Sequence, residues 1–304
     1  MTFERPYIAD RTILECVPNL SEGRRRSVID LVVGAADRPS VHLLDVHSDG
    51  DHNRTVLTLA GSLTGLVEAV LAATEVAAET VDLSRHQGVH PRLGAMDVIP
   101  FVPILGSPMR EAIMAARVCA ERIWRQLGIP CFLNGNAAGA PDRRALPDIR
   151  RRAFRELSPD LGGPYPHPTA GATVVGAREV LVAYNIVLET ERLSVAARIA
   201  SAIRERDRGL PHVRALGFPL ASRAATQVST SLLRPTVTTI ADVFDAVTAA
   251  AAAEGVEVLE AELIGLAPRA ALAGRDPESL GLSLAPKILE EELGRVFDQP
   301  PGSF

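Results

Sequence analysis

The organisation of this chain is predicted by the segment at residues 85–97, RHQGVHPRLGAMD, and by the apolar run that follows it at residues 98–103, VIPFVP. The segment lies between an Ala-rich helical pattern and a strand-like run, and loops held by such elements often carry binding and catalytic groups. Gly88 and Gly94 permit positive φ, and Pro91 biases His90 toward an extended backbone. We therefore expect the loop to present the imidazole of His90 in one defined direction.

His90 itself has two interpretations. The unperturbed pKa of a histidine, about 6.5, suits proton transfer near neutral pH, which makes His90 a candidate general acid/base. The alternative is a structural histidine that bonds to the backbone in a tight turn.

Outward from this loop, the hydrophobic pattern predicts two units with the same order of elements. In the first half we expect strands at 13–17, 41–46, 55–59 and 98–104, with helices at 21–36 and 66–77. In the second half we expect strands at 180–188, 213–218, 227–233 and 256–266, a helix at 195–203, and a helix capped by Thr239 and ended by Gly255. Each half thus reads β-α-β-β-α-β. This order predicts an α+β fold of two ferredoxin-like subdomains, 1–170 and 171–304, side by side with a ligand cleft between them.

Additional elements are expected between the two units. A helix at 111–127 precedes a short strand at 131–133, and residues 143–157 are Arg-rich and typical of a solvated helix. The stretch at 158–169 is rich in Pro and Gly and is either a linker or a binding loop.

Composition excludes several classes of protein. The 304 residues are 47% hydrophobic with a net charge of −5, which allows one large domain or two ordinary ones and argues against a general nucleic-acid surface. Residues 1–12 carry no apolar core of a signal peptide, and no apolar run is long enough to cross a bilayer. Cys16, Cys119 and Cys131 lack metal-ligand spacing and are expected to be reduced thiols in a cytoplasmic protein.

Other motifs are weak. His42, His47 and His52 recur every five residues, a spacing that places them on neither one helix face nor one strand face, and we expect no metal site. The chain has neither a complete phosphate loop nor a Gly-x-Ser-x-Gly elbow. The turn that carries Asp49, Asp51, Asn53 and Arg54 either serves local turn chemistry or forms the rim of the cleft.

The chain resembles the glutamate formimidoyltransferase (formiminotransferase) domain family in five stretches that fall in order along it: ECVPNLSEG at 15–23, NRTV at 53–56, HPRLGAMDV at 90–98, GATVVGAR at 171–178 and QVST at 227–230. The resemblance implies transfer of a formimidoyl group from N5 of 5-formimidoyltetrahydrofolate to L-glutamate, in one-carbon metabolism and histidine degradation. It also implies a cytoplasmic homodimer whose partners are folate and amino-acid small molecules, without nucleic acid or membrane. The tetrahydrofolate derivative is a co-substrate, and no metal is expected.

The resemblance also assigns residues. The catalytic histidine of the family falls on His90. The folate-binding loop falls on nine residues: Gly163, Pro164, Tyr165, Pro166, His167, Pro168, Thr169, Ala170 and Gly171.

Some family members carry a cyclodeaminase domain after this region. The chain ends at Phe304, so we expect it to be monofunctional.

The substrates are anionic, and Arg54 and Arg92 are the candidates to bind them through guanidinium groups. Asp49, Asn53 and Asn136 complete the predicted substrate-binding set. Mammalian-type members carry acidic groups where this chain has Val89, Asn136 and His47. Two alternatives therefore stay open: a folate-binding homologue without activity, and transfer of another one-carbon unit or to another amine.

Overall fold

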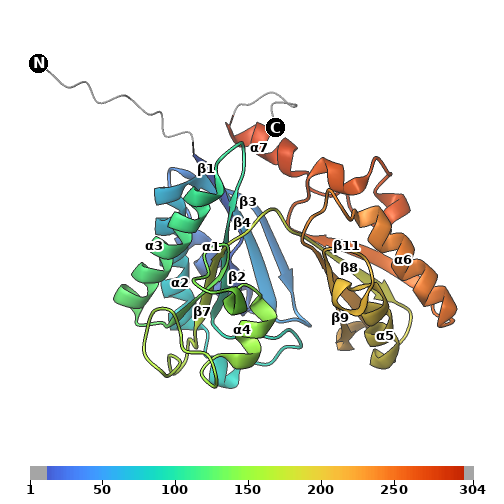
Figure 1. The fold of residues 1–304 in the computed structure, drawn as a ribbon, viewed down its shortest axis with the longest axis horizontal. Helices are drawn as coiled ribbons and strands as arrows, with labels where there is room; N and C mark the ends of the chain where they lie inside the picture. The colour runs from blue at the N-terminus through green and yellow to red at the C-terminus, as the bar shows by residue number, and fades with distance from the viewer. Residues whose placement is uncertain (1–11, 298–304) are drawn as a thin grey trace, which may run out of the picture.

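The computed structural model describes residues 12–297, which form two β-sheets with most of the helices on their outer sides (Figure 1). The two sheets turn their other faces toward each other. This arrangement confirms the expected α+β fold of two subdomains. The interpretation of residues 1–12 concerns a segment that lies, except for Thr12, outside the described residues.

The first sheet is built on the predicted order of elements. Antiparallel pairing gives the strand order β3-β4-β1/β2-β5, and Val17 and Pro18 separate β1 from β2 in the third of these positions. This is the ferredoxin-like arrangement, with both connecting helices on one face. The elements are β1 (Ile13–Cys16), β2 (Asn19–Leu20), α1 (Arg26–Ala35), β3 (Val41–Asp49), β4 (Arg54–Ser62), α2 (Leu63–Thr80) and β5 (Met96–Pro103).

Two parallel strands extend this sheet beyond β5. The chain passes through α3 (Met109–Leu127) and adds β6 (Cys131–Gly135) at the edge, and β7 (Thr173–Ala177) pairs between β5 and β6. The chain therefore leaves the first sheet only after Ala177, later than the expected boundary at 170/171. The Arg-rich segment forms only the short helix α4 (Leu146–Arg152), because Pro147 lies at the start of the helix and the chain turns after Arg152.

The second sheet has the order β11-β8-β10-β9 and is antiparallel throughout. Its helix α6 is capped by Thr239, as the sequence predicted, and Asp242 returns a bond to the backbone of Thr239, which completes a capping box. The elements are β8 (Val182–Leu188), α5 (Leu193–Ile203), β9 (Val213–Leu220), β10 (Ala225–Leu232), α6 (Ile240–Ala253), β11 (Val258–Ile264) and α7 (Leu289–Phe297). Short 3-10 turns are η1 (Leu83–Arg85), η2 (Pro141–Arg143), η3 (Glu205–Asp207), η4 (Ala221–Arg223), η5 (Arg269–Leu272) and η6 (Glu278–Leu280).

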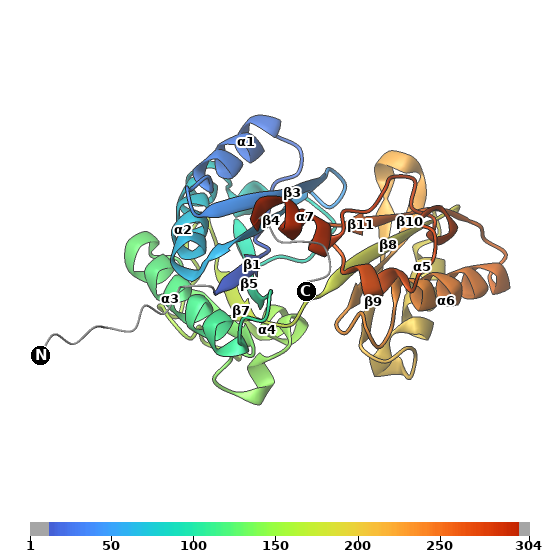
Figure 2. The ribbon, with the colours of Figure 1, turned by 90° about the horizontal axis from the view of Figure 1, so that it is seen from above.

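Each sheet buries its main core under its own helices. Alternate strand residues point to opposite faces. On β8, Val182, Tyr184 and Ile186 enter the helix-side core, so Asn185 and Val187 point toward the first subdomain. At one end of the cleft, α7 returns to the first sheet, where Leu289 and Leu293 pack on Leu44, Val102 and neighbouring residues (Figure 2). This contact closes one end of the space between the sheets.

Two composition-based expectations bear on the described residues. Within residues 12–297, no helix is long and apolar enough to cross a membrane. All three cysteines are buried and free, and burial raises the pKa of each thiol, so they are unreactive core groups.

Candidate functional site

The loop that carries His90 packs against the β3–β4 turn. We expected Gly88 and Gly94 to supply positive φ, but neither lies in the left-handed region. They are required for close approach instead. A Cβ on Gly88 would lie 2.5 Å from the carbonyl oxygen of His52, and one on Gly94 would lie 2.2 Å from that of Ala172. The two glycines therefore allow the loop to lie directly on its neighbours.

Arg92 and Asn53 hold the loop to the turn. The guanidinium of Arg92 donates to the carbonyl oxygens of His90, His52 (2.9 Å) and Asn53 (3.2 Å). The side chain of Asn53 accepts from the backbone of Gly23 and donates to that of Gln87, while its own φ is 48°. Both side chains thus have backbone partners and fix the position of His90.

Three rings meet where this loop touches the second subdomain. The ring centroid of His90 lies 6.0 Å from that of His52 and 6.0 Å from that of Phe218 in β9. His52 is 5% exposed, and its Nδ1 lies 2.8 Å from a carboxylate oxygen of Asp49. His90 therefore lies at the junction of the two subdomains, beside a buried His–Asp pair.

The two turn acids have different roles. Asp49 also accepts from the backbone N–H of His52. Burial is the largest single influence on the pKa of Asp49, and it raises the pKa. The hydrogen bonds and the charge of His52 together outweigh burial and lower the pKa to about 2. Asp51 accepts from the hydroxyl of Ser222 at 2.5 Å, across the gap between subdomains. Both earlier interpretations of the turn apply, since it bonds its own backbone and also forms the rim of the cleft.

Arg54 and Arg150 bring two guanidinium groups to this region. Arg150, in α4, forms an ion pair with the buried Asp97, and Arg54 donates to the side-chain oxygen of Asn19. In both arginines Nε is buried without a partner among the described residues. Because an unpaired buried donor is unfavourable, the pair indicates a place for an anionic group.

Burial and the neighbouring arginines together set the charge state of His90. Burial, followed by the charges of Arg54, Arg150 and His52, lowers the pKa of His90 to about 2. Burial also lowers the pKa of Arg54 to about 10, so its guanidinium stays protonated at neutral pH. The Nδ1 of His90 lies 2.8 Å from the carbonyl oxygen of Pro91, which can only accept. The neutral ring therefore carries its proton on Nδ1 and leaves Nε2 as an acceptor.

The sequence does not predict a place for Arg150 in the site, because the Arg-rich segment around it is typical of a solvated helix. The signal was present. The inward face of this helix carries apolar residues at helical spacing: Leu146 at i, Ile149 at i+3 and Ala153 at i+7. These residues pack against β6 and β7, and Arg150, at i+4, lies on the same face.

The predicted folate-binding loop at 163–171 lies beside the His90 loop. The backbones of His167 and Gly171 bond each other, and the carbonyl of Ala170 accepts from Ala95. Tyr165 is 79% exposed. One end of the loop is thus fixed next to the start of β5, and the other end is open to solvent.

Asn136 lies elsewhere. It follows β6, whose last residue, Gly135, is level with Ala177 and Phe101 in the register of the parallel strands. His90 precedes the other end of β5. Asn136 is exposed, and its amide contacts the sulfur of Met109. The structure therefore does not bring Asn136 together with His90.

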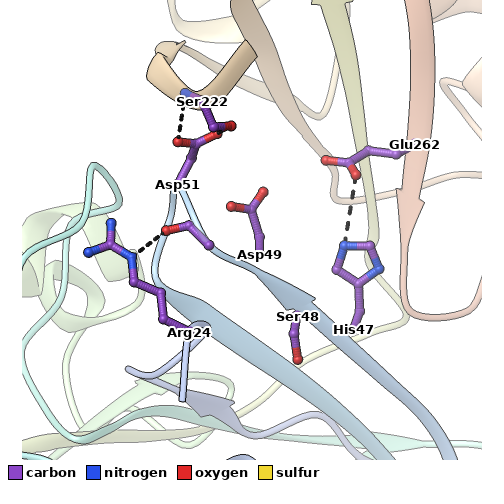
Figure 3. Close-up of a pocket in the computed structure, with 8 residues that line it drawn as sticks. Arg24, His47, Ser48, Asp49, Asp51, Ser222 and Glu262 are labelled. Atoms are coloured by element: carbon purple, nitrogen blue, oxygen red, sulfur yellow. Dashed lines mark hydrogen bonds and ion pairs between the residues drawn. The ribbon is translucent and has the colours of Figure 1, made fainter. Parts of the chain in front are cut away.

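A cavity of about 530 Å³ opens between the subdomains beside the β3–β4 turn (Figure 3). Residues from both sheets line it, which matches the expected cleft. Its lining consists of Arg24, His47, Ser48, Asp49, Gly50, Asp51, Ser222 and Glu262. Within the described part of the chain, no group of three or more His, Cys, Asp or Glu side chains is placed to hold a metal ion.

Comparison with known proteins agrees with this architecture. Two family models match successive regions: "formiminotransferase domain, N-terminal subdomain" at residues 13–178, and "formiminotransferase domain" at 183–275. The gap between them coincides with the passage from β7 to β8.

Curated relatives cover most of the chain. The glutamate formimidoyltransferase of Streptococcus pyogenes is 41% identical over 270 residues, covering 86% of this chain and 90% of the relative. That of Thermoplasma acidophilum is 39% identical over 273 residues, with the same two shares. The formimidoyltransferase-cyclodeaminase of Gallus gallus is 40% identical over 276 residues, which cover 51% of the longer chicken protein.

Proposed function

This chain belongs to the formiminotransferase domain family, and on that premise we propose that it transfers the formimidoyl group of 5-formimidoyltetrahydrofolate to L-glutamate. The observation that carries the proposal is the surroundings of His90. A neutral imidazole lies at the junction of two subdomains, and two arginines whose Nε atoms have no partner within residues 12–297 stand close enough to shift its pKa.

His90 acts as the proton carrier. Its free Nε2 accepts a proton from the ammonium of the acceptor, and the amine nitrogen then attacks the amidine carbon of the donor. The new C–N bond forms a tetrahedral intermediate. The bond from that carbon to N5 breaks as the imidazolium returns a proton to N5. General acid–base catalysis of this kind contributes roughly 10²–10⁴-fold.

The arginines link substrate binding to this proton transfer. A base with a pKa of about 2 is too weak to deprotonate an ammonium efficiently near neutral pH. Burial is the largest cause of the depressed pKa of His90, and a carboxylate bound between Arg54 and Arg150 would offset the two positive charges that lower it further. The pKa would rise when the anionic substrate binds, and the base would become effective only in the loaded site.

The loop at 163–171 is proposed to contact the folate. Its fixed end reaches the start of β5 beside the His90 loop, and its open end carries the exposed ring of Tyr165. Exposed aromatic and proline side chains on a tethered loop offer a flat apolar surface for a ring system.

Another amine acceptor is the second candidate. Of the three positions at which this chain departs from the mammalian-type pattern, only His47 lines the cavity. A change from an acidic group to an imidazole at that wall alters which acceptor fits. Glutamate remains the first choice because the curated relatives with the same span are named for it.

The direct test is incubation with 5-formimidoyltetrahydrofolate and a panel of amino acids, with products identified by mass. Formimidoylglutamate as the main product supports the proposal. Product with a different amino acid favours the second candidate, and folate binding without product in any reaction favours an inactive homologue.

We also propose a cytoplasmic homodimer. The three buried free thiols are compatible with a reducing compartment. Light scattering of the purified protein tests the dimer, since a monomeric mass at micromolar concentration would contradict it. Fractionation of cells that express the protein tests the compartment.

A further inference from the structure

A row of polar side chains on the second sheet faces the cleft and has no role in the mechanism above. Its centre is Glu262 of β11. The amide nitrogens of Asn185 (3.0 Å) and Gln227 (2.9 Å) both donate to its Oε1. Gln227 is 1% exposed and begins the QVST stretch, to which the proposed mechanism assigns no function.

Two further oxygen atoms of this row accept no hydrogen bond from the two amides. Both bond the same carboxylate oxygen, so Oε2 of Glu262 remains directed toward the cavity, where Nε2 of His47 lies 3.8 Å away (Figure 3). The Oε1 atom of Gln227 is buried and has no partner within residues 12–297. A carboxylate offers about four lone-pair positions, and a buried amide oxygen needs a donor. Among the described residues, the row therefore presents one acceptor without a donor, Oε1 of Gln227, and one with only His47 beside it, Oε2 of Glu262.

The row is continuous with His90. Gln227 is the cross-strand partner of Phe218, whose ring lies beside the His90 ring. From β9, which carries Phe218, the strip crosses β10 and β8 to β11, three strand spacings, or roughly 14 Å. The imidazole thus stands at one end of a strip of cleft surface, and Glu262 stands toward the other end.

The charge of Glu262 selects what it binds. A fixed carboxylate repels the carboxylates of glutamate and of the folate tail, which the arginines attract instead. A reduced pterin carries N–H donors, at N3 and at the 2-amino group, along the edge of its pyrimidine ring. The reacting N5 is on the other ring, so the two ends of the bicycle match the two ends of the strip.

We infer that Glu262, oriented by Asn185 and Gln227, accepts hydrogen bonds from the amino-pyrimidine edge of the folate and thereby places N5 at His90. This inference rests on the proposed function and adds to it the residues that recognise the pterin. Glu262 is then a substrate-binding residue, and Asn185 and Gln227 are positioning residues.

The test measures binding of 5-formyltetrahydrofolate by calorimetry to the wild-type protein and to Glu262→Gln. Its matched control is Glu260→Gln, because Glu260 lies on the same strand and face but pairs with Arg223 at 2.6 Å. We expect the Kd to rise roughly 10- to 100-fold in Glu262→Gln, as for loss of a hydrogen bond to a charged group, and to stay unchanged in the control. The analogue without the 2-amino group keeps only N3–H as a donor on that edge, so its Kd should rise less in Glu262→Gln than the Kd of 5-formyltetrahydrofolate does.

The outcomes separate two failures. If the wild-type protein does not bind 5-formyltetrahydrofolate, that result would contradict both the proposed function and this inference. Wild-type binding with an unchanged Kd in Glu262→Gln would overturn the inference alone. A raised KM for the amino acid with an unchanged folate Kd would also overturn it, because Glu262 would then serve the ammonium of the acceptor.

If Glu262→Gln fails to fold, Asn185→Ala replaces it and should raise the folate Kd severalfold, whereas an unchanged Kd would contradict the inference.

Discussion

The ring of Phe218, in the second subdomain, lies 6.0 Å from the ring of His90 in the first and 5.2 Å from that of His52, which it meets edge-on. The His90 loop therefore touches both halves of the molecule. Arg92 and Asn53 fix it from one side, and Phe218, which is 8% exposed, closes it from the other.

The first prediction concerns this contact. Phe218→Ala removes the apolar support of both histidines, and we expect a loss of about 2–4 kcal/mol in the free energy of unfolding. We also expect a fall in kcat of roughly tenfold, since His90 loses its fixed orientation. Urea unfolding and steady-state kinetics measure the two effects. Phe218→Leu keeps most of the buried surface and is the control. Wild-type kcat in Phe218→Ala would show that the contact has no catalytic role.

The second prediction concerns Arg150. Arg150→Lys keeps the charge beside Asp97 but lacks the planar fork that binds a carboxylate at two points. We expect kcat/KM to fall by roughly 10- to 100-fold, mainly through KM. Arg151→Lys, in the same helix, changes an arginine that is 68% exposed and pairs with Asp148, and it should have no effect. Equal kinetics in the two variants would remove Arg150 from the site.

The third prediction follows from the pKa of His90. The folded-state pKa is about 2 and the ordinary value is 6.5, so between these pH values the unfolded chain binds more protons than the folded one. Stability is therefore lost as the pH falls below 6.5. Between pH 6.5 and 4.5, we expect the wild type to lose about 1–2 kcal/mol more than His90→Gln, a figure reduced for partial solvent exposure.

Chemical denaturation of both proteins at several pH values checks this difference. The window lies above the ordinary pKa of Asp49, 3.8, as well as above its folded value of about 2, so the protonation of that carboxylate does not interfere. Parallel stability curves for wild type and His90→Gln would mean that His90 titrates normally in the folded protein.

The fourth prediction tests the close packing of the loop. A Cβ on Gly88 would meet the His52 carbonyl oxygen and, at 2.9 Å, the Cβ of Asn53. Gly88→Ala should therefore destabilise the protein by about 1–3 kcal/mol. Gly34 lies in α1, and apart from its own helix no atom of the described residues lies within 4 Å of its added Cβ, so Gly34→Ala should stabilise the protein by about 0.5–1 kcal/mol. Thermal unfolding compares the pair, and similar melting temperatures for both would contradict the packing.

The sequence predicted the two units because their signals are local. The alternation of apolar residues in β8 and β10 and the helical spacing in α5 identify the elements, and their order identifies the ferredoxin-like units. His90 was found because its loop gathers Gly, Pro and His between two regular elements.

The rest of the site depends on packing between distant segments. Arg150 faces inward because α4 lies on β6 and β7, and its local charge pattern concealed this. Phe218 and Glu262 join the site only when the second sheet faces the first. Asn136 shows the converse, since a motif comparison selected it while the strand register places it at the other end of β5.

The central claim is that His90 carries the proton in the transfer. The measurement is the rate of formimidoylglutamate formation by His90→Ala, alongside its folate Kd and its melting temperature. We predict a rate lower by roughly 10²–10⁴-fold with folate binding and folding retained. A folded variant that binds folate and turns over at the wild-type rate would contradict the account.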